Sequence, residues 1–181
     1  MQGRAENSGI EPNGENSLMS ELQFRDLFDI EEIQRIQDAF SLASGVASLF
    51  TDLDGNPITQ PSRFTRFCQL IRGTSGGMER CKQSDAFIGL LNPTGPVCGL
   101  CSSGKLFDGG TGITVGERQI ANWLIGQVRD DTVEDSYYRQ YAQELGLDQQ
   151  DLIQALQEVP KMSRARFEQI CQALHLIAAQ F

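Results

Sequence analysis

The sequence predicts an α+β fold built on a largely antiparallel sheet. Helical periodicity runs through residues 29–44 and again through most of the chain after residue 133, whereas residues 113–115 and 120–128 alternate in the manner of a hairpin. Helices placed before and after a run of hairpin-connected strands are typical of the α+β class. We therefore expect an antiparallel sheet of about five strands flanked by helices.

Length and charge limit the possible functions. The chain has 181 residues, which suits one domain with short appendages, and 15 Lys+Arg against 24 Asp+Glu give it a formal charge of −9. Such a field repels nucleic acid and anionic membranes, so neither is an expected partner. Residues 1–20 are polar, lack the apolar core of a secretory signal, and predict a disordered tail. We expect a cytoplasmic protein.

The first structured segments predict a helix followed by a hairpin. Asp29 is a suitable N-cap, apolar residues then recur at helical spacing, and Gly45 ends the helix. Residues 46–51 predict a strand, and the turn at 52–55 leads into a short second strand at 57–58. The Asp-x-Asp-Gly turn lacks the later acidic ligands of a calcium loop, so the turn is the better interpretation.

The centre of the chain predicts two helices and then three strands. A Pro-Ser cap at 61–62 precedes the first helix, and a glycine-rich break at 73–77 separates it from the second. The expected elements are helices over 62–71 and 78–91, strands over 97–101, 113–115 and 120–128, and a glycine-rich loop over 102–112.

The last third predicts three helices, over 133–145, 148–158 and from Ser163 to the final residue. Phe167, Leu174 and Phe181 are spaced by seven, which matches a coiled-coil seam. An amphipathic helix lying on the sheet fits the same periodicity. We expect residues 131–181 to be a C-terminal helical extension that leads to an output region, with a homodimer along its last helix.

Cysteine is the only concentrated reactive residue type. Cys68, Cys81, Cys98 and Cys101 form a C-x12-C-x16-C-x2-C pattern, and Cys171 lies in the last apolar stripe. Four thiolates can hold zinc or an iron–sulfur cluster, but a zinc site usually has two short C-x2-C knuckles and only one is present. The alternative is that free cysteines pack as small apolar groups and line a pocket.

The sequence offers no constellation for catalysis. His175 is the only histidine and lies among the apolar residues of the last helix. The glycine-rich segments lack the Gly-Lys-Ser/Thr of a phosphate loop and the strand–helix setting of a dinucleotide fingerprint. Asp85 follows Cys81 by four residues and shares its helical face, so it must be paired, hydrogen-bonded or open to a cavity. We expect the isolated domain to be non-catalytic.

Several segments resemble one known family. They are Leu27-Phe28-Asp29-Ile30-Glu31-Glu32, Thr51-Asp52-Leu53-Asp54-Gly55, Phe64-Thr65-Arg66-Phe67-Cys68, Gly77 through Cys81-x-x-Ser84-Asp85, Cys101 with Gly104, and Ile120-Ala121-Asn122-Trp123-Leu124-Ile125-Gly126-Gln127-Val128. Over about residues 22–129 the chain resembles the PocR sensory domain family, in the form found at the N-terminus of bacterial histidine kinases. The sensory domain is accordingly expected over residues 21–130.

The resemblance implies a PAS-like fold variant that senses small hydrocarbon derivatives such as short diols. It also implies that Cys68, Cys81, Asp85 and Cys101 face one pocket. Cys98 is not part of the family pattern, and its presence keeps the zinc or iron–sulfur alternative open.

We therefore predict the input domain of a signal-transduction protein, a histidine kinase or another regulator. A small organic ligand would lie in a cysteine-lined pocket and act through the C-terminal helix. Phe67, Phe107 and Trp123 are the expected walls, and Asn122 and Gln127 the expected polar contacts beside Asp85. The alternative is a redox or metal sensor in which Cys68, Cys81, Cys98 and Cys101 ligate zinc or an iron–sulfur cluster. No other cofactor is expected.

Overall fold

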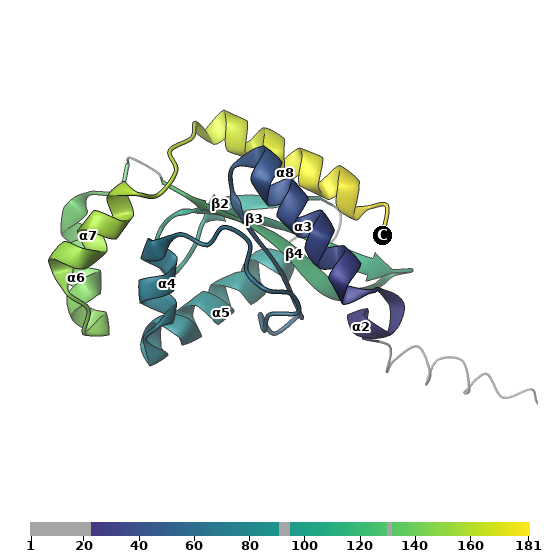
Figure 1. Ribbon diagram of the computed structural model, residues 1–181, viewed down its shortest axis with the longest axis horizontal. Helices are drawn as coiled ribbons and strands as arrows, with labels where there is room; N and C mark the ends of the chain where they lie inside the picture. The colour runs from purple at the N-terminus through teal and green to yellow at the C-terminus, as the bar shows by residue number, and fades with distance from the viewer. Residues whose placement is uncertain (1–22, 91–94, 130–131) are drawn as a thin grey trace, which may run out of the picture.

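A computed structural model describes residues 23–90, 95–129 and 132–181 of the chain. The predicted disordered tail, residues 1–20, lies outside these described residues, as do the expected helix end at residue 91 and the expected domain boundary at 130–131. Among the described residues, helices lie on both faces of one antiparallel sheet (Figure 1).

The sheet has four strands in the described residues: β1 (Ala47–Thr51), β2 (Val97–Leu100), β3 (Phe107–Val115) and β4 (Arg118–Val128). Their order is β1-β4-β3-β2, and every neighbouring pair is antiparallel. The predicted α+β class is confirmed, but the count of about five strands is not. Pro57 forms only an isolated bridge with Thr51, because a proline has no N–H to continue a ladder.

Strand β3 begins inside the segment that we expected to be a glycine-rich loop. Gly109, Gly110 and Gly112 all pair with β4. A Cβ on Gly110 would lie 2.7 Å from the Leu124 side chain, and one on Gly109 would lie 2.5 Å from the Cys171 sulfur. These glycines therefore allow neighbouring side chains to pack directly on the backbone of the sheet.

The helices divide between the two faces. Helices α2 (Phe24–Leu27), α3 (Ile30–Ser44) and α8 (Arg164–Ala178) cover one face, whereas α4 (Arg66–Arg72), α5 (Ser75–Leu90), α6 (Asp135–Leu145) and α7 (Gln149–Gln157) lie toward the other (Figure 1). The expected caps of α3 and α8 are confirmed, with Asp29 and Ser163 accepting backbone N–H groups. Helix α4 instead begins at Arg66, after the N-cap Thr65, whose side chain accepts a hydrogen bond from Cys68 N. Ser62 is not the cap because it pairs with Ser48 of β1.

Two apolar cores form among the residues that the structure describes. Trp123, Phe50 and the buried side of α8 form the first, and Phe67, Leu106 and the tyrosines of α6 form the second. In α8, Phe167 and Leu174 are fully buried against the sheet of their own chain. Of the two interpretations of the terminal stripe, the structure shows the amphipathic helix lying on the sheet.

Candidate functional site

A small cavity lies between the sheet and helices α4 and α5. Its volume is about 30 Å³, which is room for about one or two water molecules. Apolar side chains such as Leu124 form part of its wall. Its polar lining is unusual for a core, and comes from Ser48, Arg72, Asp85, Asp108 and Gln127.

An ion pair closes one side of this cavity. The Arg72 guanidinium, from the last turn of α4, donates to Asp85 of α5 at 2.7 Å, and the two side chains are only 15% and 10% exposed. Burial raises the pKa of Asp85, and Arg72 opposes that rise. Arg72 Nε is buried and finds no acceptor among the described residues. The pair therefore carries one unused donor beside the cavity.

Asp108 is the second acidic group of the site, and it is held by an irregularity in β4. The register shifts beside it, so that Asp108 pairs with Gly126 and Gln127 is left as an extra residue with φ of +60°. The Gln127 N–H has no backbone partner in the ladder and donates instead to Asp108 Oδ1 at 2.8 Å. Burial raises the pKa of Asp108 to about 7, against the opposing effect of that hydrogen bond. Near neutral pH both the protonated and the ionised form of this carboxyl are therefore populated.

The Gln127 side chain connects the strand irregularity to the start of α4. Its Oε1 accepts hydrogen bonds from Thr65 N at 2.7 Å and from Thr65 Oγ1 at 2.9 Å. A non-glycine residue at positive φ is strained by roughly 1–3 kcal/mol and persists only where its surroundings fix it. Here the two Thr65 bonds and Asp108 fix it, so the strained residue, the acid and the helix N-terminus form one connected unit.

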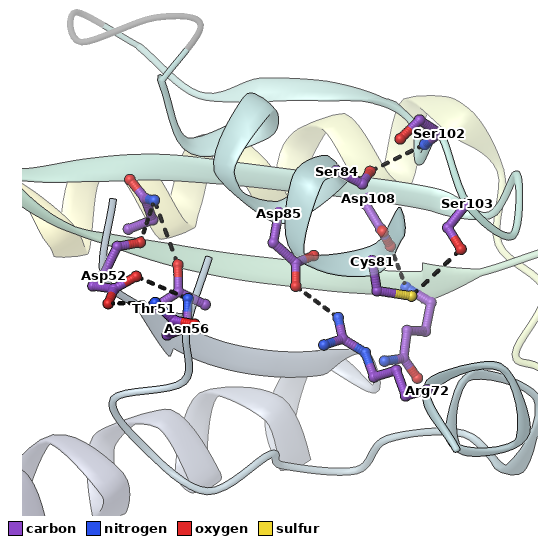
Figure 2. Close-up of polar contacts among 12 residues, drawn as sticks. Thr51, Asp52, Asn56, Arg72, Cys81, Ser84, Asp85, Ser102, Ser103 and Asp108 are labelled. Carbon is purple, nitrogen blue, oxygen red and sulfur yellow. Dashed lines mark hydrogen bonds and ion pairs between the residues drawn. The ribbon is translucent and has the colours of Figure 1, made fainter. Parts of the chain in front are cut away.

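Three cysteines lie in the same core as the site. Cys68, Cys81 and Cys101 belong to or pack against the cluster beneath α4 and α5. Burial raises the pKa of each thiol, and Asp108 adds to the rise in each case. Cys81 Sγ donates to Ser103 Oγ at 3.4 Å, and Figure 2 shows this thiol near Asp108 and the Arg72–Asp85 pair. The thiols are neutral neighbours of the cavity, not part of its immediate wall.

A surface groove adjoins the cavity. It has a volume of about 730 Å³ and shares Leu49, Phe64 and Arg72 with the cavity lining. The Arg72 guanidinium lies 5.1 Å from the centroid of the Phe64 ring. Arg63 and Lys82 also line this groove. Phe64 and Arg72 thus lie where the cavity and the groove meet.

A family model described as "Sensory domain found in PocR" matches residues 26–181. The chain belongs to the PocR sensory domain family. The chain is also similar to the regulatory protein PocR of Salmonella typhimurium (strain LT2), with 32% identity over 101 residues, which cover 55% of this chain and 33% of that protein. The chain therefore matches about a third of the length of this curated relative.

Membership in the PocR family assigns this domain a sensing role in regulation. No solved structure gives a significant match. Within the part of the chain that the structure describes, no helix has both the length and the apolar character needed to cross a bilayer.

The structure of this PocR domain brings some of the predicted site residues together. Asp85 and Gln127 line the cavity, and the three cysteines of the family pattern lie in the adjoining core. Phe67 lies in that core too, packed edge-on against Tyr138 with ring centroids 5.6 Å apart. Regular alternation of side chains along β4 would place Gln127 on the same face as Trp123. Gln127 reaches the cavity face because the strand contains one extra residue.

Other predicted residues lie elsewhere. Phe107 stacks on Phe167, and Trp123 stacks on Phe50, both in the core on the opposite face of the sheet. Asn122 is fully buried, and its Nδ2 donates to the Asp52 carbonyl at 3.0 Å, which fixes the turn after β1. These three residues serve packing or turn geometry in this PocR domain.

The four cysteines of the metal alternative are divided between the two faces. Cys98 packs on the α8 side with Cys171, whereas Cys68, Cys81 and Cys101 lie on the α4–α5 side. Within the described ranges, no three His, Cys, Asp or Glu side chains are grouped closely enough to hold a metal ion.

Sequence patterns do not identify two central residues of the site. Asp108 lies in a segment whose glycines predict a loop, and Arg72 lies at the end of a short helix. The signal that could have found them is a charged residue inside an otherwise apolar or glycine-rich element, for which burial demands a partner.

Proposed function

We propose that this PocR domain is the ligand-binding input of a cytoplasmic signal-transduction protein, a histidine kinase or another regulator. Its ligand is a small organic molecule with hydroxyl groups, such as a short diol, bound beneath α4 and α5. The observation that supports this most is the group of Arg72, Asp85, Asp108 and Gln127 around one cavity. Buried charges, a strongly shifted pKa and backbone strain concentrate at functional sites.

The site has the hydrogen-bonding groups that a diol requires. Arg72 Nε offers a free donor. Asp108 accepts hydrogen bonds when ionised and also donates one when protonated, and its pKa of about 7 gives it both forms near neutrality. A ligand with two hydroxyl groups matches such a mixed set, whereas a purely apolar molecule would leave these groups unpaired.

Binding must enlarge the cavity. The space of about 30 Å³ suits water and is too small for a diol. Phe64 and Arg72 belong to the lining of both the cavity and the outer groove, so we infer that a ligand enters between them and favours an opened arrangement of α4. The family's three cysteines lie beside this path and would line the enlarged pocket.

The sheet offers a direct route from the site to the C-terminal helix. Asp108 lines the cavity, while its neighbours Phe107 and Gly109 contact α8 through Phe167 and Cys171. A ligand that shifts Asp108 must therefore move residues on which α8 packs. We include in the proposal that the domain is a PAS-like variant, in which one face of the sheet binds the ligand and the other carries the output helix.

The experiment is a thermal-shift and calorimetric titration with a panel of ethane-, propane- and butanediols. A ligand at 100 times its Kd should stabilise the folded chain by about 2.7 kcal/mol. Arg72→Met and Asp108→Leu should abolish the shift. Arg35→Met, which removes an exposed guanidinium from α3, is the matched control and should bind normally.

The proposal fails if no diol binds and no small molecule co-purifies with the folded chain. It also fails if a diol stabilises Arg72→Met and Asp108→Leu as strongly as the unmodified chain.

A further inference from the structure

The two cysteines outside the candidate site lie together on the opposite face of the sheet. Cys98 is on β2, directly across from Gly109 of β3, and Cys171 is in the middle of α8. A Cβ built on Gly109 would lie 2.5 Å from Cys171 Sγ and 3.5 Å from Cys98 Sγ. Both sulfurs thus lie over the same glycine, and the two thiols are hydrogen-bonded to each other.

One thiol of the pair is accessible and the other is not. Cys171 is fully buried, whereas Cys98 is only partly buried on the edge strand of the sheet. A cavity of about 60 Å³ adjoins Cys98 and is lined in part by Arg164, Phe167 and Glu168 of α8. A small reagent can therefore approach Cys98 from the edge of the sheet but cannot reach Cys171 directly.

The surroundings also differentiate the two sulfurs chemically. The hydrogen bond from Cys171 lowers the pKa of Cys98, and the positive charge of Arg164 lowers it further. Burial and the negative charge of Glu168 act in the opposite direction and raise it. The same hydrogen bond and burial raise the pKa of Cys171. A partly exposed thiol favoured as thiolate, next to a buried thiol that keeps its proton, is the arrangement of an attacking and a resolving cysteine.

We propose that Cys98 and Cys171 form a reversible disulfide that fastens α8 to the edge strand β2. The oxidant is a low-molecular-weight disulfide such as oxidised glutathione. The Cys98 thiolate attacks one sulfur of the oxidant, which forms a mixed disulfide and releases one thiolate. Cys171, after losing its proton, then attacks the Cys98 sulfur and releases the second thiol. Two protein thiols are oxidised and one small disulfide is reduced to two thiols.

This cysteine pair is separate from the diol site and reacts with small disulfides instead of binding a hydroxylated ligand. Helix α8 packs on β3 and β2, and a bond between Cys98 and Cys171 restricts its movement against the sheet. The domain would then carry two inputs on one helix, a ligand on one face of the sheet and thiol redox state on the other.

The test uses the full chain treated with oxidised glutathione, blocked with iodoacetamide, and analysed by mass spectrometry without reduction. We expect a loss of two hydrogens, one Cys98–Cys171 cross-linked peptide, and complete reversal by dithiothreitol. Cys171→Ala should instead hold one glutathione on Cys98, and Cys98→Ser should leave Cys171 unmodified. Arg164→Gln should slow the reaction roughly two- to threefold, while Arg166→Gln, an exposed residue on the same helix, should not.

Two results would overturn the proposal. One is a folded chain without substitutions that accumulates glutathione on Cys98 and does not form the cross-link. The other is a dominant disulfide that involves Cys68, Cys81 or Cys101 instead. Because both results are read in the unmodified chain, neither depends on the stability of a variant.

Discussion

Replacing Asp108 by asparagine should remove a pH dependence from the stability of this domain. Burial raises the pKa of Asp108 to about 7 from 3.8. The folded state therefore binds this proton more tightly than the unfolded state. The stabilisation is fully present below about pH 4 and is lost as pH rises through about 7. A pKa difference of about three units corresponds to about 4 kcal/mol. We reduce this to about 2–4 kcal/mol because Asp108 is only partly buried.

Asp108→Asn retains an oxygen for the Gln127 N–H but cannot ionise. Relative to the unmodified chain, this variant should therefore gain about 2–4 kcal/mol in unfolding free energy between pH 4 and pH 8. Urea unfolding, followed by the fluorescence of Trp123, provides the assay, since Trp123 is the sole tryptophan and is fully buried. The control is Asp54→Asn, which alters an exposed carboxylate.

A stability difference between Asp108→Asn and the unmodified chain that stayed constant from pH 4 to pH 8 would refute the raised pKa of Asp108. A difference that changed in the opposite direction would do so too, because it would mean that the folded state favours the ionised carboxylate.

Three further predictions follow from the site. Arg72→Met should lower the free energy of unfolding in urea by about 2–4 kcal/mol, because it leaves Asp85 buried and unpaired. Adding Asp85→Leu should recover most of that loss. A double variant no more stable than the single one would argue against the ion pair. Gln127→Ala should lose about 1–2 kcal/mol with its two hydrogen bonds to Thr65, and Gln127→Gly should be more stable than the alanine variant because glycine tolerates the positive φ; equal stabilities would contradict the strain. Anaerobically purified protein should be colourless and contain no stoichiometric zinc or iron by elemental analysis, because burial keeps the thiols beneath α4 and α5 protonated; one metal ion per chain would instead favour the metal-sensor alternative.

Local signals in the sequence were sufficient for most of the helices. The caps Asp29 and Ser163 and the terminating Gly45 act within one helical turn, so their effect can be seen without knowing the fold. The prediction of a fifth strand at residues 57–58 was wrong because strand pairing depends on a distant partner, and Pro57 has no N–H to donate to such a partner. The glycines of β3 were interpreted as loop residues because their role, close packing against Leu124 and Cys171, exists only in three dimensions.

The site was predictable only in part, for a related reason. Asp85 was expected to need a partner, and the structure supplies Arg72. Strict alternation along β4 places Gln127 beside Trp123, whereas one extra residue in the strand turns it to the cavity. Such an irregularity changes the face of every later residue, and nothing in the local sequence of β4 announces it.

The most direct test of the proposed sensing site is amide chemical-shift mapping of the isotopically labelled chain during titration with the tightest diol of the panel. We predict that the largest shifts fall on Arg72, Asp108 and Gln127, with a second set at the α8 contacts Phe167 and Cys171. Shifts confined to the outer groove, or the same shifts in Asp108→Leu, would contradict a ligand site built on the buried polar cluster.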